Sequence, residues 1–587
     1  MDDETATGAS TETLQARVAE LESALLVSNN ALLDRDRELA RARSERDKLR
    51  EAWQAVKFEL ELLKKRLFVA KAERIDVEQL ELEFAAKLAE LDALSKRLQP
   101  VPAWMMATVP GESSGDANPP AKKKTGGRRD VRELELDEVR IELADPVMGE
   151  VTKQLGYEES CQLAWRKGGF VRIVVARRKH EQETTQAEQA AGAGPTTVVT
   201  AAKPVETFPG LLAAPSLLAH IAVDKHCDGL PLHRQQERFT RDGVKLDRGT
   251  MSRWMENLGN TLGATLVNAA RAHFLATAFS FLTDATGVLV QPLKSDAMKK
   301  RQPCRRGHFF VQLADKDFAF FEYVPKETSV AVAELFKGFS GYLQADAKSV
   351  YDTLYPAPNA EPEADDCLEV GCWCHARRKF WEAAIAHCAV SREALVRIQR
   401  LFENEETWKR LAPEHVKALR DERTRPLLDA FFAWATTEYA KVKDTRGLLR
   451  SALGYVVRQR AALCRFLEDG RLGLSNNASE RELRRIAVGR KAWMFVGSDD
   501  HAQAAAALFT LIATCKLHGL EPEAYLRDVI RVLGAWPRDR YLELCPHAFA
   551  ATRARLNPAE LALEVGPLTV PPTPTPAPAL SVAAPTG

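Results

Sequence analysis

The chain has 587 residues, with 82 Lys and Arg against 81 Asp and Glu, so its formal net charge at pH 7 is +1. This length suggests roughly three to five domains, and the balanced charge excludes a uniformly basic nucleic-acid protein, so any basic surface must be local. Ten cysteines in so long a chain argue against a disulfide framework and for a reducing compartment.

Residues 11–99 are predicted to form a coiled coil, or leucine zipper. Apolar residues recur at alternating steps of four and three between Leu14 and Leu67, which keeps one stripe facing a partner helix. A second helical pattern follows from Val77 to Leu98. The first stripe is too long and narrow for a globular helix, which favours a homo-oligomer; a helical hairpin packed on its own protein is the alternative.

Two linkers flank a small β-rich module. The first linker, residues 100–130, ends in a basic cluster that either contacts phosphates or stays solvated: Lys122, Lys123, Lys124, Arg128 and Arg129. Residues 131–180 form the module, in which VRIEL and GGFVRIVVARRKH are typical of strands. Residues 181–206 are the second linker.

Residues 207–265 are predicted to form a helix-turn-helix. Three short helical segments are separated by turns, and Asp247 is a plausible cap for the third. The buried stripe of the third helix is Met251, Trp254 and Leu258. Arg248 and Arg253 fall on its exposed side, where a recognition helix contacts DNA. A three-helix packing module that never meets DNA is the alternative.

Residues 275–535 have the pattern of an α/β domain. A strand, FSFLTDATGVLVQPL, precedes a hairpin whose turn is Ala314–Asp317, and a helix, a strand GYLQAD, a short strand EVGCWCH and the helix ARRKFWEAAIAH follow. This order is typical of a ribonuclease-H-like domain. Residues 390–470 form an all-α insertion, and residues 536–587 are a C-terminal tail with a disordered, Pro-rich end.

Three carboxylates are candidates for one divalent-metal site: Asp284 and Asp346, each at the end of a β-like run, and Glu480 in LSNNASERELRR. Phosphoryl transfer on DNA can use two Mg²⁺ or Mn²⁺ ions held by such oxygen ligands, and two ions are expected here. Each acid also has a structural interpretation: a turn, a helix cap, and a capping box with Asn477. The cations after Glu480 favour the metal site, because phosphates would lie between them and the acids: Arg481, Arg484, Arg485, Arg490 and Lys491.

Four segments resemble transposases of the insertion sequence 66 family. They are ELELLKKRLFVAKAER, the helix-turn-helix region, GCWCHARRKFWEA, and a specific block from LSNNASERELRRIAVGRKAW to LEPEAYLRDVI. The resemblance covers about residues 55–535. It implies an Asp-Asp-Glu DNA transposase in which Asp284, Asp346 and Glu480 are both the catalytic residues and the metal ligands.

The resemblance also implies partners and a location. The DNA partners are the terminal inverted repeats of the element and a target DNA, and accessory proteins of the same element are a further class. Arg377 and Arg378, next to His375, are expected to contact DNA or neighbour the active site. The start of the chain lacks a secretory signal and no run of about 18 apolar residues predicts a membrane span, so we expect a bacterial, cytoplasmic, nucleoid-associated protein.

Three departures from the family pattern leave an alternative open. Ala285-Thr286 follow Asp284 where the family usually has Glu-Thr, and Ala347-Lys348 follow Asp346 where it usually has Gly-Tyr. Residues 131–180 hold one cysteine, Cys161, so the family's zinc module is expected to bind no zinc. Cys372 and Cys374 would point the same way on a strand, and a structural role is favoured. A catalytically inactive DNA-binding relative is the alternative function.

Overall fold

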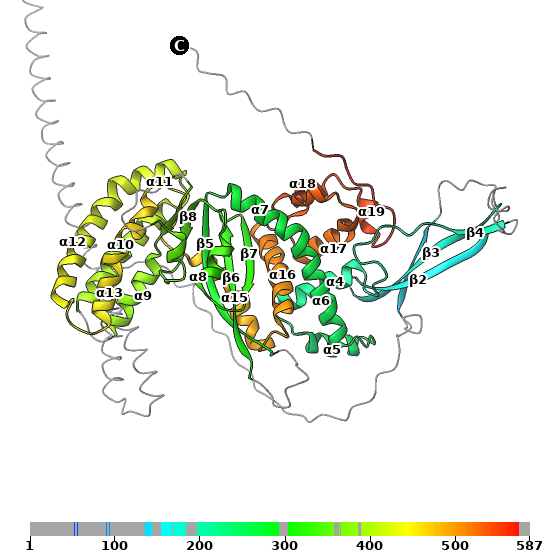
Figure 1. Cartoon of the computed structure of the whole chain (residues 1–587), viewed down its shortest axis with the longest axis horizontal. Coiled ribbons are helices and arrows are strands. Elements are labelled where there is room, and N and C mark those ends of the chain that lie inside the picture. The colour runs from blue at the N-terminus through cyan, green and yellow to red at the C-terminus, as the bar shows by residue number, and fades with distance from the viewer. Residues whose placement is uncertain are drawn as a thin grey trace, which may run out of the picture. The chain divides into compact units, whose positions relative to one another are not determined.

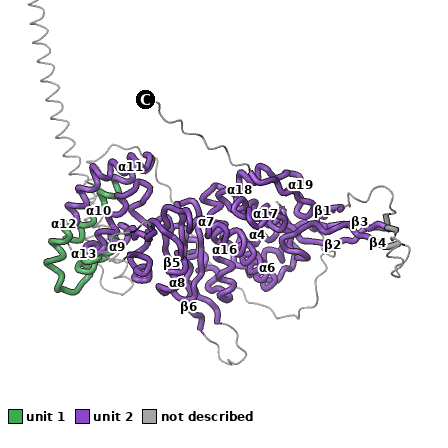
Figure 2. Tube along the Cα trace, turned by 45° about the horizontal axis from the view of Figure 1, so that its top comes forward, with its two compact units in different colours: residues 1–123, 377–403, 433–455 green, residues 124–376, 404–432, 456–587 purple. Residues whose placement is uncertain are grey.

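The computed structural model describes residues 136–143, 154–166, 168–183, 196–292, 303–356, 365–385 and 389–574, with a few single residues elsewhere. Figure 2 colours its two compact units, which are residues 1–123, 377–403 and 433–455, and residues 124–376, 404–432 and 456–587. The predicted coiled coil, the first linker and the end of the tail lie outside the described residues, single positions apart. Within those residues, no helix is long and apolar enough to cross a membrane.

The β-rich module is a four-stranded sheet. Its strands are β1 (Asp137–Leu143), β2 (Gln154–Arg166), β3 (Gly169–Glu183) and β4 (Thr196–Thr200). β3 pairs with all three others, parallel to β1 and antiparallel to β2 and β4. The sequence indicated β1 and β3 only. The sequence did not indicate β2, because the middle of this strand is polar, and it assigned β4 to the second linker.

The three predicted helices of residues 207–265 are present as α4 (Pro215–His226), α5 (Leu232–Arg241) and α6 (Arg248–Leu262). The predicted cap is confirmed, since Asp247 accepts a 2.8 Å hydrogen bond from the Gly249 amide. Nearly all of α4 is buried, because α16 (Asp499–Leu517) and α17 (Pro522–Val532) pack against it in one core. A π-helical turn, η2 (Gly263–Val267), joins α6 to α7 (Asn268–Thr277).

A five-stranded mixed sheet lies at the centre of the larger unit, in the order β7-β6-β5-β8-β9. Its strands are β5 (Ser280–Val290), β6 (Arg305–Ala314), β7 (Phe318–Val324), β8 (Gly341–Gln344) and β9 (Cys367–Val370). β6 is antiparallel to β5 and β7, whereas β8 is parallel to β5 and to β9. The predicted hairpin turn is confirmed, with positive φ at Asp315 and Lys316.

Three strand ends differ from the prediction. β5 continues past Asp284 to Val290, β8 ends at Gln344 rather than Asp346, and β9 ends at Val370. Cys374 therefore lies in helix α9 (Trp373–Ala384), so it does not share a strand with Cys372. Between β7 and β9 the chain also forms α8 (Ser329–Leu335) and the short turn η3 (Asp352–Leu354).

Successive side chains of a strand point to opposite faces of the sheet, and both faces of the central sheet are apolar. On β6, Phe309, Val311 and Leu313 pack towards α15 (Asn477–Trp493) and α16, while Phe310 and Ala314 pack on the opposite side. Figure 1 shows α15 and α16 beside the strands that they cover. The sheet is therefore packed on both faces, and the alternation of side chains decides which residues face α15.

The insertion is helical throughout its described residues, as predicted. Its elements are α10 (Ala389–Trp408), α11 (Pro413–Leu419), η4 (Arg420–Thr424), α12 (Arg425–Val442), α13 (Leu448–Arg458), α14 (Arg460–Cys464) and η5 (Arg465–Leu467). Arg420 is 1% exposed and binds both carboxylate oxygens of Glu405, at 2.8 and 2.6 Å. It also donates to the carbonyls of Phe466, Asp469 and Leu472. Arg420 thus fixes the loop that leads into α15.

Residues 536–574 are folded rather than a tail. They contain η7 (Arg538–Leu544), α18 (Pro546–Arg553) and α19 (Pro558–Ala562), after the short η6 (Leu533–Ala535). Leu544, Phe549 and Leu561 belong to the same core as α4 and α17. Proline at the first position of α18 and α19 starts each helix. The tail was predicted from proline content, and composition alone does not distinguish prolines that start helices from those of a disordered segment.

The crossing of α6 and α16 depends on Gly259. A Cβ atom there would lie 2.2 Å from the backbone oxygen of Ala504 on α16, so the helices would have to separate. We expect Gly259→Ala to lower the free energy of unfolding by about 2 kcal/mol in urea titrations. Asn260→Ala, one residue later and exposed, is the control and should not be destabilising, because Ala favours the helix more than Asn does. Equal stability of both variants would contradict this account.

Candidate active site

Asp284 lies in the middle of β5 and faces α15. Leu282, Val288 and Val290 of β5 share a core with Leu483 and Ile486 of α15. Asp284 is an even number of residues from each of these β5 positions, so its side chain leaves the sheet on the same side. It is half-buried, and one of its oxygens accepts a 2.8 Å hydrogen bond from the Ala285 amide.

Asp346 follows β8 at the level of Asp284. The parallel pairing of β5 with β8 aligns Leu282 with Gln344 as its last pair. Asp284 and Asp346 are each two residues further along, so Asp346 lies just past the carboxyl end of β8 while Asp284 is still within β5. The charges of the two acids interact.

Glu480 is in the first turn of α15, and Asn476 fixes that turn to β5. The buried Asn476 side chain donates a 2.5 Å hydrogen bond to the carbonyl of Thr283, the residue before Asp284. Ser479 donates to the Asn476 side-chain oxygen at 2.6 Å. The predicted capping box is wrong, because Asn476 is the cap residue and its side chain makes no capping bond. Asn476 serves the tertiary contact instead.

The three carboxylates interact electrostatically. Burial, followed by the charges of Asp346 and Glu480, raises the pKa of Asp284 to about 6, against the opposing effects of the Ala285 amide and Lys348. A negative charge on Asp284 is therefore disfavoured by both of the other acids. A cation between the three groups would remove this repulsion.

The chemistry of the residues fits a divalent cation. Asp346 Oδ1 is buried and has no hydrogen-bond partner, which leaves a hard oxygen donor unused. Asp346 Oδ2 lies 3.3 Å from the Lys348 ammonium, which is also 3.3 Å from Glu327, and Glu480 lies 3.8 Å from His375 Nε2. In the part of the chain that the structure describes, no three acidic, His or Cys side chains lie close enough to hold one metal ion. Lys348 supplies positive charge beside Asp346.

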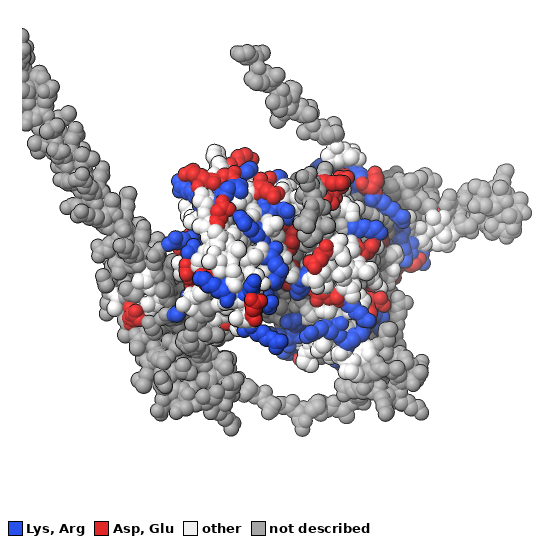
Figure 3. All heavy atoms as spheres, turned by 60° about the vertical axis from the view of Figure 1, so that its left-hand side comes forward, with Lys and Arg blue, Asp and Glu red and all other residues white. Residues whose placement is uncertain are grey.

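The predicted DNA contacts divide into exposed and structural groups. Arg481, Arg484 and Lys491 are exposed and recur at helical spacing, so they share one face of α15. Arg485 instead pairs with Glu482 at 3.1 Å. Arg490 donates to the Thr286 hydroxyl at 3.0 Å and to the Gly287 carbonyl. Figure 3 shows Lys and Arg side chains gathered in stretches across one face of the molecule.

The other predicted contacts lie on two further helices. Arg248 and Arg253 are exposed on α6, and Arg253 donates to the Thr250 hydroxyl at 3.2 Å. Arg377 and Arg378 follow His375 on α9 but belong to the other compact unit.

Sequence reasoning missed the residues that hold the site together. Gln344 donates to the carbonyls of Gly371 and Gly473, at 3.3 and 2.8 Å, and Cys372 Sγ accepts a 3.3 Å bond from the Asn476 amide. Hydrogen bonds, first from Cys372, lower the pKa of Cys374 to about 6. The departure at Lys348 was visible in the sequence, whereas no local pattern indicates Gln344 or Asn476.

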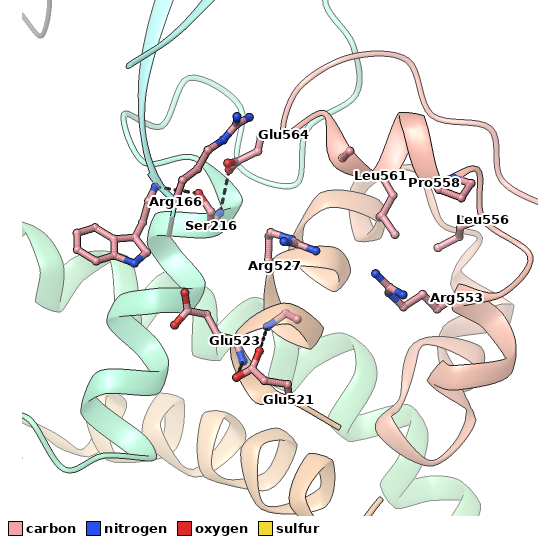
Figure 4. Close-up of a pocket in the computed structure, with 13 residues that line it drawn as sticks. Arg166, Ser216, Glu521, Glu523, Arg527, Arg553, Leu556, Pro558, Leu561 and Glu564 are labelled. Atoms are coloured by element: carbon pink, nitrogen blue, oxygen red, sulfur yellow. Dashed lines mark hydrogen bonds between the residues drawn. The ribbon is translucent and has the colours of Figure 1, made fainter. Parts of the chain in front are cut away.

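A large pocket lies apart from the carboxylates, among β2, α4, α17 and α19. It encloses about 840 Å³, and Figure 4 shows Arg527 and Arg553 on one side of Glu523. Arg527 and Arg553 both pair with the buried Asp528, and the pocket's other charges include Glu521, Glu523 and Glu564. Asp528 and the carboxylates of the pocket wall thus neutralise the charges of Arg527 and Arg553, so the pocket does not favour an anionic ligand.

The raised pKa of Asp284 predicts how the stability of the protein depends on pH. The folded protein binds a proton here more tightly than the unfolded chain, so metal-free stability falls as pH rises from about 4 to 6 and stays lower above pH 6. We expect Asp284→Asn to raise the free energy of unfolding by about 1 to 2 kcal/mol at pH 7.5 and to have little effect at pH 4. Urea titrations in EDTA measure both values.

Asp365→Asn, at an exposed position, is the matched control for that comparison. A gain for Asp284→Asn that is the same at both pH values would mean that the ionisation of Asp284 is not its cause.

Comparison with known proteins identifies the family. The model described as Transposase IS66 family matches residues 210–504, and the IS66 C-terminal element matches residues 510–547. Uncharacterized protein y4hP of Sinorhizobium fredii (strain NBRC 101917 / NGR234) is 30% identical over 367 residues, which cover 58% of this chain and 63% of that protein. Uncharacterized protein y4qI of the same organism is 28% identical over 362 residues, 60% and 66% of the two chains. This chain thus spans less than two thirds of either relative, and it belongs to the IS66 family of transposases.

Proposed function

We propose that the chain is an Asp-Asp-Glu DNA transposase that cleaves the ends of an insertion sequence and joins them to target DNA. Asp284, Asp346 and Glu480 are its catalytic residues and bind Mg²⁺ or Mn²⁺, with two ions expected. The observation that carries the proposal is the electrostatic coupling of Asp284 to both other acids. Family membership supports the reaction class.

The architecture supports the finer assignments. The strand order β7-β6-β5-β8-β9 with only β6 reversed is that expected of a ribonuclease-H-like domain. The capped helix α6, with Arg248 and Arg253 exposed, supports a helix-turn-helix that recognises terminal repeats. The heptad pattern of residues 14–67 supports a coiled-coil homo-oligomer, which would hold two DNA ends together. Such a substrate also implies action at the bacterial nucleoid, with accessory proteins of the element as further partners.

Each residue has a distinct role in this proposal. A divalent cation bound by the three carboxylates would neutralise charge on the attacking and leaving oxygens of a phosphodiester. Asn476 holds the start of α15, and therefore Glu480, against β5. Arg481, Arg484 and Lys491 would contact phosphates beside the cleaved bond, and Arg377 and Arg378 are further candidates.

A catalytically inactive DNA-binding relative is the second candidate, and one observation favours it. The Lys348 ammonium lies 3.3 Å from Asp346 Oδ2, where it competes with a metal ion for the same carboxylate. The family usually has Tyr at this position. Metal binding therefore has to displace Lys348 or act beside it.

Loss of one carboxylate should abolish the reaction but not DNA binding. We expect Asp346→Asn and Glu480→Gln to lower strand transfer on the order of a thousandfold, since each removes an oxygen ligand worth several kcal/mol of charge stabilisation. The assay uses DNA ends that flank the gene, with Mg²⁺ or Mn²⁺, and Asp365→Asn is the control. Binding to DNA ends without cleavage by the wild type would overturn the first proposal and support the second.

Replacing Lys348 should separate the two candidates further. Lys348→Met keeps the length of the side chain and removes its charge, so we expect about tenfold tighter Mn²⁺ binding, measured by isothermal titration. Lys326→Met, which is exposed nearby, is the control. If neither the wild type nor Lys348→Met binds Mn²⁺, the proposed metal site is wrong.

A further inference from the structure

A second pocket, of about 720 Å³, lies between the helices α4, α5 and α6 and the far end of α15. Its charged and titratable lining is cationic or neutral, with Lys225, Arg248 and three histidines and no Asp or Glu among its described lining residues. Aromatic side chains complete the wall: Phe309, Trp493, Phe495 and Phe509. Its volume is typical of sites that hold a small organic ring.

His226 in this pocket has unused hydrogen-bonding capacity. The residue is only 4% exposed, and neither of its ring nitrogens has a hydrogen-bond partner. Burial lowers its pKa well below the usual value, so the ring is neutral and offers one donor and one acceptor. His501, also in the lining, is by contrast satisfied by Ser498 and Ser252, at 2.8 and 3.0 Å. Such an unpaired buried group indicates a ligand with polar edges.

Phe495 is held at the pocket by a strained turn. Met494 has φ of 61°, and the Phe495 amide donates a 2.7 Å bond to the Trp493 carbonyl, which is the geometry of a γ-turn. Val496 then bonds to Leu289 at the end of β5, at 2.8 Å. Phe495 remains 38% exposed. Strain of this kind is found where a side chain is presented for function.

The pocket lies at the C-terminal end of α15. From Glu480 to Trp493 the helix rises about 20 Å, and Arg481, Arg484 and Lys491 are exposed between those ends. At about 3.4 Å per nucleotide, a strand bound along the helix reaches the pocket about six nucleotides from the carboxylates. Lys225 and Arg248 are then available to its phosphates.

We propose that this pocket, which we call the base pocket, binds one unstacked base of the DNA strand. Phe495 stacks on the base, His226 bonds to its polar edge, and Lys225 and Arg248 contact the adjoining phosphates. The inference rests on the proposed function, because the strand has to follow α15 from the carboxylates.

The test compares two probes with equal phosphate number, (dT)20 and an abasic oligonucleotide of the same length. The full chain in EDTA is titrated with each at one salt concentration by fluorescence anisotropy. We expect (dT)20 to bind roughly five- to a hundredfold more tightly, and Phe495→Ala to remove most of this ratio. His226→Leu should act in the same direction, whereas Arg481→Gln with Arg484→Gln should weaken both probes equally.

Leu517→Ala is the matched control, since Leu517 is also 38% exposed but lies on α16 and does not line the pocket. Its ratio should equal that of the wild type, and the thermal unfolding of every variant verifies folding. A ratio unchanged by Phe495→Ala, with both probes still bound, overturns the base pocket and leaves the transposase proposal standing. No affinity for either probe also overturns the base pocket, while the strand-transfer assay on DNA ends decides the proposed function separately.

Discussion

The hydrogen bond from the buried Asn476 side chain to the Thr283 carbonyl connects the parts of the chain on which the candidate site depends. The last β5–β8 pair is Leu282 with Gln344, so the Thr283 carbonyl lies where the ladder has just ended. Asn476 satisfies this carbonyl and thereby fixes the first turn of α15 next to Asp284. A buried amide can do this only when both of its ends are bonded, and Ser479 provides the second bond.

The helical insertion contributes to the same geometry through its buried charge. Arg420 binds Glu405 on one side and three carbonyls of residues 466–472 on the other. A guanidinium has five donors in a fixed plane, so these contacts define the path of the loop before α15. Gln344 extends this support, because it bonds to Gly473 from the end of β8. The loop that carries Asn476 is thus held from the sheet and from the insertion.

Holding three acids near one another has an energetic cost that the rest of the site offsets only in part. Lys348 provides positive charge beside Asp346. Asp284 nevertheless has a raised pKa, because its burial and then the charges of Asp346 and Glu480 disfavour its ionised form. In a site of this kind, unfavourable interactions between like charges lower the stability of the metal-free protein. A bound cation removes them, so the free energy is recovered on binding. His226 in the base pocket is comparable, because its buried ring nitrogens lack hydrogen bonds that a bound ligand would supply.

The sequence by itself determined the local structure: the hairpin turn at Asp315 and Lys316, the cap at Asp247, the helical insertion and the family. These features depend on turn chemistry, periodicity and motifs, which act between residues close in the chain. The sequence also identified Asp284 and Asp346 as candidates, through expected positions at strand ends, and Glu480, through the cations that follow it. The resemblance supported all three. Only the tertiary structure decided that Asn476 ties α15 to β5 rather than capping, that Arg490 is structural, and that residues 538–562 are folded. Those outcomes depend on partners hundreds of residues away, such as Thr283 and Gly287, and no local pattern encodes them.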